Sequence, residues 1–272
     1  MEQVVERAVR IIRERYAEPL SLDDVARAVL VSKFHLLRVF DQFTGVTPGR
    51  FLGAVRMGEA KRLLQFSDLG VATISAEVGY SSTGTFTRRF SESVGVTPTR
   101  YRELSRGRGA LAVAPSAGRR GRVGRCRVRG IVRADAEPGS PVCIGAFDGP
   151  ILQGQPFGWT TTDRLGPFSL PRLPPGVCYL HATMRAATGM PGRPPGTALF
   201  TALLGPLRLD PFADCEVELV LRPRTWSQPP ILFALPGIEV PAQTESPALS
   251  PAMDSSAIEE KTGREPACNT HL

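Results

Sequence analysis

One phrase occurs twice in the chain, and this duplication constrains the fold more than any other feature. Residues 45–51 read GVTPGRF, and residues 95–101 read GVTPTRY, an offset of 50 residues. Phe40 and Phe90 match at the same offset, whereas 25–32 and 74–81 match at an offset of 49, so the second copy holds one extra residue. A repeat of about fifty residues accommodates a small helical unit with a connecting helix, and not a whole domain.

Each copy of the phrase predicts the end of one helix and the start of another. Gly45 and Gly95 follow apolar helical patterns, where a residue at positive φ commonly ends a helix. A threonine then caps the next helix, and a proline takes its first position, where the missing N–H costs nothing. This punctuation is structural and is compatible with many functions.

The residues before the first phrase predict two short helices joined by a tight turn. The first helix carries apolar residues at the spacing of one helical face. These residues are Leu22, Val25, Ala26 and Val29. The second helix follows Ser32, and we expect its buried stripe to be Leu36, Val39, Phe40 and Phe43. Its outward stripe is then Phe34, Leu37, Arg38 and Asp41, an arrangement that fits a helix-turn-helix unit.

The second copy predicts the same unit again. Ile74 and Val78 line its first helix, the turn falls at Gly79 and Tyr80, and its second helix is expected to present an outward stripe. That stripe is Gly84, Thr87, Arg88 and Ser91. A longer helix from about residue 48 to residue 66 connects the two units.

Taken together, residues 1–104 resemble the DNA-binding domain of the AraC/XylS family of bacterial transcription regulators. The matching motifs are HLLRVF (35–40), the two GVTP phrases, RMGEAKRLL (56–64) and VGYSSTGTFTRRF (78–90). The resemblance implies two helix-turn-helix units whose recognition helices enter successive major-groove segments of one DNA duplex, roughly 34 Å apart. Leu30 and Ser75 depart from the small residues that the family usually has at these positions.

The resemblance also implies which side chains face DNA. By position, the base-reading residues are Phe34, Leu37, Arg38, Thr83, Gly84, Thr85, Thr87 and Arg88. The phosphate-side residues are Ser32, Lys33, His35, Ser82 and Arg89. An arginine fork on guanine is worth about 1–3 kcal/mol of discrimination, and phenylalanine or leucine can pack on a thymine methyl. The alternative for Arg38 and Arg88 is an ordinary solvated helix face or a surface ion pair, and that for His35 is a packing role.

Two charged residues of the connecting helix receive a structural interpretation. Arg56 and Glu59 are three residues apart, and an intramolecular ion pair explains them better than a DNA contact does.

Charge is distributed unevenly along the chain. Its 33 Lys and Arg exceed its 26 Asp and Glu, and the isoelectric point near 9.6 suits a polyanionic partner. Between Glu103 and Asp135 there are nine arginines and no acidic residue. We expect 107–124 to be a basic flexible linker, which either tracks DNA phosphates or is simply a solvated connector.

From Cys126 onward the apolar pattern changes to the period of two that is typical of strands. We expect strands at 126–133, 141–147, 157–162, 166–170, 177–184, 198–204 and 215–221. Turn signals such as EPGS and RLPPG separate them, so the fold class is an N-terminal all-α domain followed by an antiparallel β-sandwich. Residues 162–182 resemble the prealbumin-like or carboxypeptidase-regulatory-like sandwich family, whose members are commonly accessory or interaction modules.

Neither a catalytic nor a metal site is predicted. The five cysteines have no CxxC pairing, and Cys178 and His181 would point to opposite faces of a strand. His181 is read as a satisfied surface or core residue, and no cofactor or enzyme activity is expected. The N-terminal helix is too polar for the apolar core of a signal peptide, and no membrane span is expected, which suggests a cytoplasmic, nucleoid-associated protein.

The predicted organisation has four parts. They are a DNA-binding domain (1–106), a linker (107–124), a sandwich (125–224) and a disordered tail (225–272). Within the tail, the apolar segment 231–240 has the alternative of docking on the sandwich, although nothing in the sequence requires it. The leading hypothesis is a sequence-specific transcription regulator with double-stranded DNA as partner, RNA polymerase as a candidate partner, and a sandwich that senses an unknown effector or binds a partner. The alternatives are a weakly specific DNA-attachment protein whose sandwich recruits a protein, and an enzyme in the sandwich.

Overall fold

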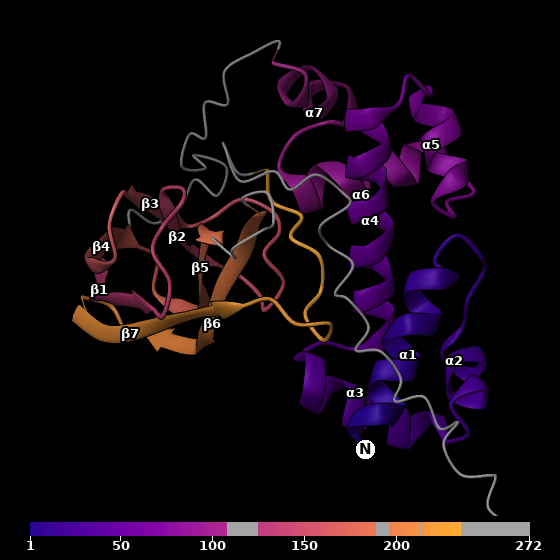
Figure 1. Ribbon diagram of the computed structural model, residues 1–272, viewed down its shortest axis with the longest axis horizontal. Helices are drawn as coiled ribbons and strands as arrows, with labels where there is room; N and C mark the ends of the chain where they lie inside the picture. Colours follow the sequence, from indigo (N-terminus) through magenta and orange to yellow (C-terminus); the bar gives the residue numbers. More distant parts are fainter. Residues whose placement is uncertain (108–124, 189–195, 213, 235–272) are drawn as a thin grey trace, which may run out of the picture.

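The computed structural model describes residues 1–107, 125–188, 196–212 and 214–234. Helices occupy the described residues before 108, and strands follow from Cys126 (Figure 1). The helices are α1 (Glu2–Glu14), α2 (Leu22–Ala28), α3 (Lys33–Thr44), α4 (Pro48–Phe66), α5 (Val71–Glu77), α6 (Thr83–Val94) and α7 (Pro98–Ser105). Apart from Gly107, the segment expected to be a linker lies outside the described residues.

The repeated phrase has the local structure that its residues predict. Gly45 and Gly95 end α3 and α6 in the left-handed conformation, with φ of 71° and 92°. The threonine of each copy accepts a hydrogen bond from the backbone N–H three residues later, and the proline is the first residue of the next helix. The two copies therefore end the recognition helices and start α4 and α7.

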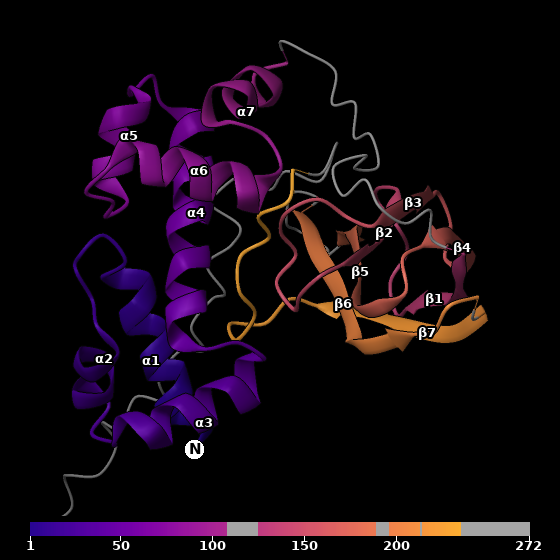
Figure 2. The same ribbon diagram turned by 180° about the vertical axis from the view of Figure 1, so that it is seen from behind.

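Two helix-turn-helix units lie at opposite ends of α4, with α1, α2 and α3 at one end and α5, α6 and α7 at the other (Figures 1 and 2). Leu30 and Gly79 occupy the two turns with positive φ of 59° and 81°. A Cβ added at Gly79 would lie 2.6 Å from the carbonyl oxygen of Ala17, so the second turn requires glycine. Leu30 tolerates the same backbone region because its side chain is 86% exposed.

The apolar stripes predicted from the spacing are largely confirmed. Leu36, Val39 and Phe40 are buried, as are their counterparts Phe86 and Phe90. Aromatic edge contacts continue this core into the following helices, with ring centroids 5.5 Å apart for Phe40–Phe51 and 5.7 Å apart for Phe90–Tyr101. Phe43 was expected in the buried stripe, but it is 37% exposed, because it lies near the end of α3 where the core no longer covers it.

The second domain is a seven-stranded mixed sheet. Its strands are β1 (Cys126–Ala134), β2 (Val142–Phe147), β3 (Gly158–Thr162), β4 (Gly166–Leu173), β5 (Gly176–Thr188), β6 (Gly196–Leu209) and β7 (Asp214–Pro223). The strand order is β3-β2-β5-β6-β7-β1-β4, and β3 also contacts β4, so the sheet curls into a nearly closed barrel.

The expectation of an antiparallel sandwich is therefore wrong, since β1 and β7 pair in parallel. The seven strands lie where the sequence predicted them, and the predicted inward face of β1 is confirmed by the buried Val128 and Val132. Alternation shows which face of a strand is buried, and it does not show which strands become neighbours. The pairing of β1 with β7, which are distant in sequence, could therefore not be predicted from it.

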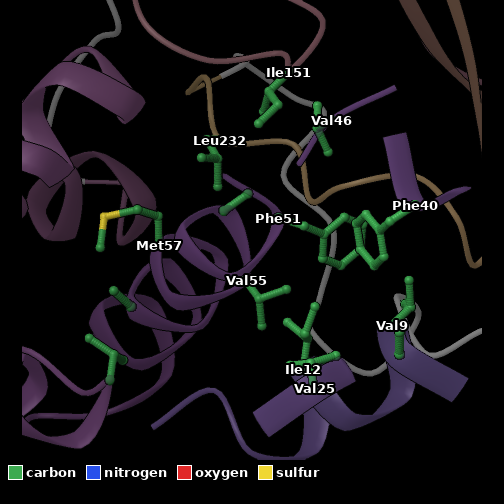
Figure 3. Close-up of a cluster of buried hydrophobic side chains, with 14 of the residues drawn as sticks. Val9, Ile12, Val25, Phe40, Val46, Phe51, Val55, Met57, Ile151 and Leu232 are labelled. Atoms are coloured by element: carbon green, nitrogen blue, oxygen red, sulfur yellow. The ribbon is translucent and has the colours of Figure 1, made fainter. Parts of the chain in front are cut away.

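Residues 225–234, which we call the strap, also differ from expectation. They were predicted to be part of a disordered tail, yet Leu232 and Ala234 are buried in the core of the helical domain together with Ile151. Figure 3 shows Leu232 and Ile151 directed toward α4. The composition of the tail is polar and proline-rich on average, but its short run ILFA is apolar enough to be buried. Residues 235–272 lie outside the described residues.

The strap is held by hydrogen bonds to both domains. The backbone N–H groups of Leu232 and Phe233 donate to the carbonyl of Leu152, at 2.9 and 3.0 Å. The N–H of Ala234 donates to the carbonyl of Val94, and that of Gly154 donates to the carbonyl of Ser93 at 2.6 Å. The strap and the β2–β3 connection (148–157) therefore fasten the sheet domain to the helical domain.

Candidate nucleic-acid interface

The central helix α4 sets the distance between the two recognition helices. It has 19 residues, which corresponds to a length of about 28 Å. Recognition helices that read adjacent major-groove segments must lie about one DNA turn apart, roughly 34 Å. A continuous helix between the units therefore supplies a spacer of suitable length and little flexibility.

The first recognition helix, α3, presents a large and partly apolar outward surface. Phe34 is 74% exposed, Arg38 is exposed and Leu37 is half-buried. The Arg38 guanidinium lies 3.5 Å from Nδ1 of His35, and Lys33 pairs with Asp23 at 3.5 Å. The Lys33 ammonium also lies 5.8 Å from the centroid of the Phe34 ring. These contacts hold charge beside an exposed ring at the start of α3.

The second recognition helix, α6, presents small polar residues around its arginines. Thr83, Gly84 and Thr85 are exposed, whereas Thr87 is half-buried. Arg88 is exposed and lies 3.9 Å from the carboxylate of Glu92, which at this exposure is a weak interaction. The arginine is therefore available to a ligand at low cost.

The two serines that precede these helices act as caps. The Ser32 hydroxyl accepts a hydrogen bond from the backbone N–H of His35 at 3.3 Å, and the Ser82 hydroxyl accepts one from Thr85 at 3.4 Å. Both serines are exposed, so capping leaves their O–H groups directed to solvent. Contact between these hydroxyls and DNA phosphates stays a prediction.

The arrangement places Arg38 and Arg88 at equivalent positions of two exposed helix faces. Each lies two residues before a fully buried phenylalanine, Phe40 or Phe90, which anchors its helix in the core. Neither arginine is tucked into the core, and both retain exposed guanidinium groups.

One expected ion pair of α4 is wrong. Arg56 does not pair with Glu59; its guanidinium donates to the carbonyls of Tyr16 and Glu18, each at 2.7 Å. Glu59 instead accepts a hydrogen bond from Arg62 at 2.7 Å. Partial burial lowers the pKa of Arg56. Arg56 therefore ties α4 to the loop after α1, a long-range contact that sequence spacing could not reveal.

Sequence reasoning also missed a cleft of about 610 Å³ between α4, α6 and the β2–β3 connection. Arg50 and Arg56 of α4 and Arg89 of α6 line it, together with Asp148 of the sheet domain. Arg89 was expected to have a phosphate-side role and Arg56 to form an ion pair, and no sequence signal joins these arginines, because the cleft exists only where the two domains meet.

Three titratable groups of the sheet domain are buried. His181 is buried, and its Nε2 lies 2.9 Å from the carbonyl oxygen of Gly149. Burial lowers the pKa of His181 to about 4, and burial raises the pKa values of Cys143 and Cys178 to about 11. In the described part of the chain, no group of three His, Cys, Asp or Glu side chains is arranged to hold a metal ion. None of the helices placed there is long and apolar enough to cross a membrane.

Two helix-turn-helix units on one rigid helix, each with an exposed arginine-bearing recognition helix, define the class of helix-turn-helix DNA-binding proteins. Comparison with known families agrees, since residues 25–104 match the family described as a helix-turn-helix domain. The probable transcription factor PqrA of Proteus vulgaris is 37% identical over 86 residues, which cover 32% of this chain and 70% of PqrA. The chain belongs to the AraC-type family of helix-turn-helix transcription regulators.

Other relatives match over a smaller part of their length. The uncharacterized regulator YisR of Bacillus subtilis is 32% identical over 103 residues, covering 38% of this chain and 36% of YisR. Among solved structures, an AraC-type transcriptional regulator from Chromobacterium violaceum is 30% identical, with 40% of this chain and 96% of that chain covered and a TM-score of 0.38. The DNA-binding domain of AdpA in complex with a target DNA is 27% identical, with 38% and 94% covered and a TM-score of 0.37.

Proposed function

We propose that this transcription regulator reads two adjacent major-groove segments of one DNA duplex with α3 and α6. The observation that carries the proposal is the pair Arg38 and Arg88, equivalent in sequence and exposed on helices that α4 holds apart. A guanidinium can donate two hydrogen bonds to guanine O6 and N7 in the major groove. Because both units are in one chain, two half-sites are read without a second subunit.

The first unit adds apolar readout to this pair. Phe34 is exposed and has no structural role in the core, so its ring is free to pack on a thymine methyl. Leu37 lies one helical turn further along α3 and extends the same surface. The phosphate-side residues, Lys33, His35 and Arg89 among them, position the helices without reading sequence.

The sheet domain serves in this proposal as a sensing or partner-binding module. Its support is the strap and Ile151, which contribute side chains to the core of the helical domain. Any ligand or protein that shifts the sheet domain would therefore act on the reading domain through packed contacts. RNA polymerase is one candidate partner for the exposed surface of the regulator.

Selection of bound sites from random DNA tests the proposal. We expect the full chain to select a motif with two half-sites about one turn apart. Arg38→Ala and Arg88→Ala should each weaken the selected site by about 1–3 kcal/mol and relax one base position. The control is Arg164→Ala, an exposed arginine in the β3–β4 turn. Unchanged ratios between selected and random DNA for both arginine variants would contradict sequence reading by these residues.

The same experiment addresses a second candidate, a weakly specific DNA-attachment protein. That candidate is favoured by the first turn of α6, where Thr83, Gly84 and Thr85 offer few base contacts. It predicts one enriched half-site or none, with binding that depends on salt and not on sequence.

A further inference from the structure

The cleft between the domains collects positive charge that the described residues do not neutralise. Arg50, Arg56 and Arg89 line it, against the carboxylates of Asp148 and Glu92. Glu92 already lies beside Arg88, at 3.9 Å. In the part of the chain that the structure describes, no ion pair joins Arg50 or Arg89 to a carboxylate.

Arg56 forms a fixed wall of this cleft. Its guanidinium donates to the carbonyls of Tyr16 and Glu18, and it lies 5.8 Å from the centroid of the Tyr80 ring. Tyr80 and Thr85 also line the cleft. The site thus has a held cation and two further guanidinium groups, which together match the oxygens of a phosphate or carboxylate.

The position of the cleft adds to the charge. Gly49 and Arg50 belong to the first turn of α4, where the helix dipole favours an anion. Its volume of about 610 Å³ lies within the range of small-molecule sites, which occur preferentially at domain interfaces. One wall comes from each domain, so an occupant would contact the reading helix α6 and the sheet domain together.

We propose that this cleft binds an oxyanion, a phosphate or carboxylate group, which accepts hydrogen bonds from the guanidinium groups of Arg50, Arg56 and Arg89. The proposal rests on the function proposed above, because the cleft lies on α4 and α6 beside the reading surface. The oxyanion has two sources of the same chemistry: a backbone phosphate of DNA between the two groove segments, or a small organic anion that acts as effector.

The test uses the full chain and the variant Arg50→Gln, because Arg89 is already assigned to the phosphate-side residues, with Arg164→Gln as the control for net charge. Thermal unfolding is followed in inorganic phosphate and in citrate, against chloride at equal ionic strength. Binding to a selected DNA site and to random DNA is measured over a range of salt concentrations.

If the source is DNA, Arg50→Gln should lower the slope of log affinity against log salt by about 1, and weaken selected and random DNA alike. If the source is a free anion, citrate or phosphate should raise the melting temperature of the wild type but not of Arg50→Gln, with an unchanged salt slope. Both results support the oxyanion site. The proposal is overturned if Arg50→Gln behaves as Arg164→Gln does in both arms.

This outcome is separable from failure of the proposed function. Arg50→Gln should leave the ratio of the affinities for selected and random DNA unchanged, whereas Arg38→Ala and Arg88→Ala should change it. A protein with an intact ratio but no cleft effect would retain its reading helices and lose only the oxyanion site.

Discussion

The two helix-turn-helix units are alike where they are buried and different where they face outward. Leu36 and Phe40 of the first unit correspond to Phe86 and Phe90 of the second, and all four are fully buried. On the outward faces, Phe34 and Leu37 correspond to Gly84 and Thr87. The core thus preserves the fold in both copies, while each outward face is free to acquire its own reading chemistry.

The turns of the two units also differ, because one is closely packed and the other is exposed. Gly79 cannot carry a side chain because the carbonyl of Ala17 lies too close, whereas Leu30 projects into solvent from the same backbone region. The first helices differ as well: a capping box formed by Ser21 and Asp24 starts α2, while Gly70 starts α5 without a side-chain cap. The second unit therefore depends more on packing and less on local signals.

The largest expected effect comes from the strap that both units share. Leu232→Ala removes a side chain buried in the core of the helical domain beside α4, so we expect a loss of about 2–5 kcal/mol in the free energy of unfolding. Chemical denaturation of the full chain measures it. Leu203→Ala is the matched control, since Leu203 is 50% exposed. Equal, small losses for both variants would show that the units do not depend on the strap.

A smaller effect on stability is expected in the second turn, and it has the opposite sign to the effect of the same substitution inside α4. Gly79→Ala forces an alanine into the left-handed region, at about 1–2 kcal/mol, and brings its Cβ against the backbone of Ala17. We expect a total loss of about 3 kcal/mol in thermal or chemical unfolding. Gly53→Ala makes the same substitution inside α4, where nothing lies within 4 Å, and should stabilise by roughly 0.5–1 kcal/mol. Two changes of the same sign would contradict the steric reason.

These contrasts show how much of the fold could be predicted from sequence. Helix ends at Gly45 and Gly95, helix starts at the GVTP prolines and the inward face of β1 all follow from local chemistry and periodicity. The parallel pairing of β1 with β7 could not be predicted, because each strand reports its buried face and not its neighbour.

The strap and the cleft escaped prediction for a related reason. The run at 231–234 is apolar but short, and only the surface formed by α4 and the β2–β3 connection makes its burial favourable. Arg50 and Arg56 line the cleft only because Asp148 and its neighbours, which belong to the sheet domain and are distant in sequence, form the opposite wall. The reading residues were accessible because the repeat aligns one unit on the other, although their contact with DNA stays a prediction.

On DNA, the difference between the outward faces predicts unequal half-sites. Phe34→Ala should weaken the selected site by about 1 kcal/mol, because it removes the exposed ring that is proposed to pack on a thymine methyl. Thr87→Ala in the second unit, at the position that corresponds to Leu37, should cost less, since the threonine side chain is smaller than the Phe34 ring and half-buried. Affinities for sites with each half-site mutated in turn measure the asymmetry. If mutation of either half-site lowered the affinity equally, the two outward faces would not differ in how they read DNA.

The smallest expected effect lies in the first turn and has the opposite sign. Leu30 adopts a φ of 59°, a region that costs an L-residue about 1–2 kcal/mol, and its side chain gains little burial in return. Leu30→Gly removes this cost but adds conformational freedom to the unfolded chain, so we expect a net stabilisation of up to about 1 kcal/mol. Leu30→Ala is the control: it removes the side chain, retains the strained backbone and should change stability little. A midpoint of denaturation that falls for Leu30→Gly would mean that the leucine side chain itself stabilises the turn, and the two turns would then differ in packing and not only in backbone strain.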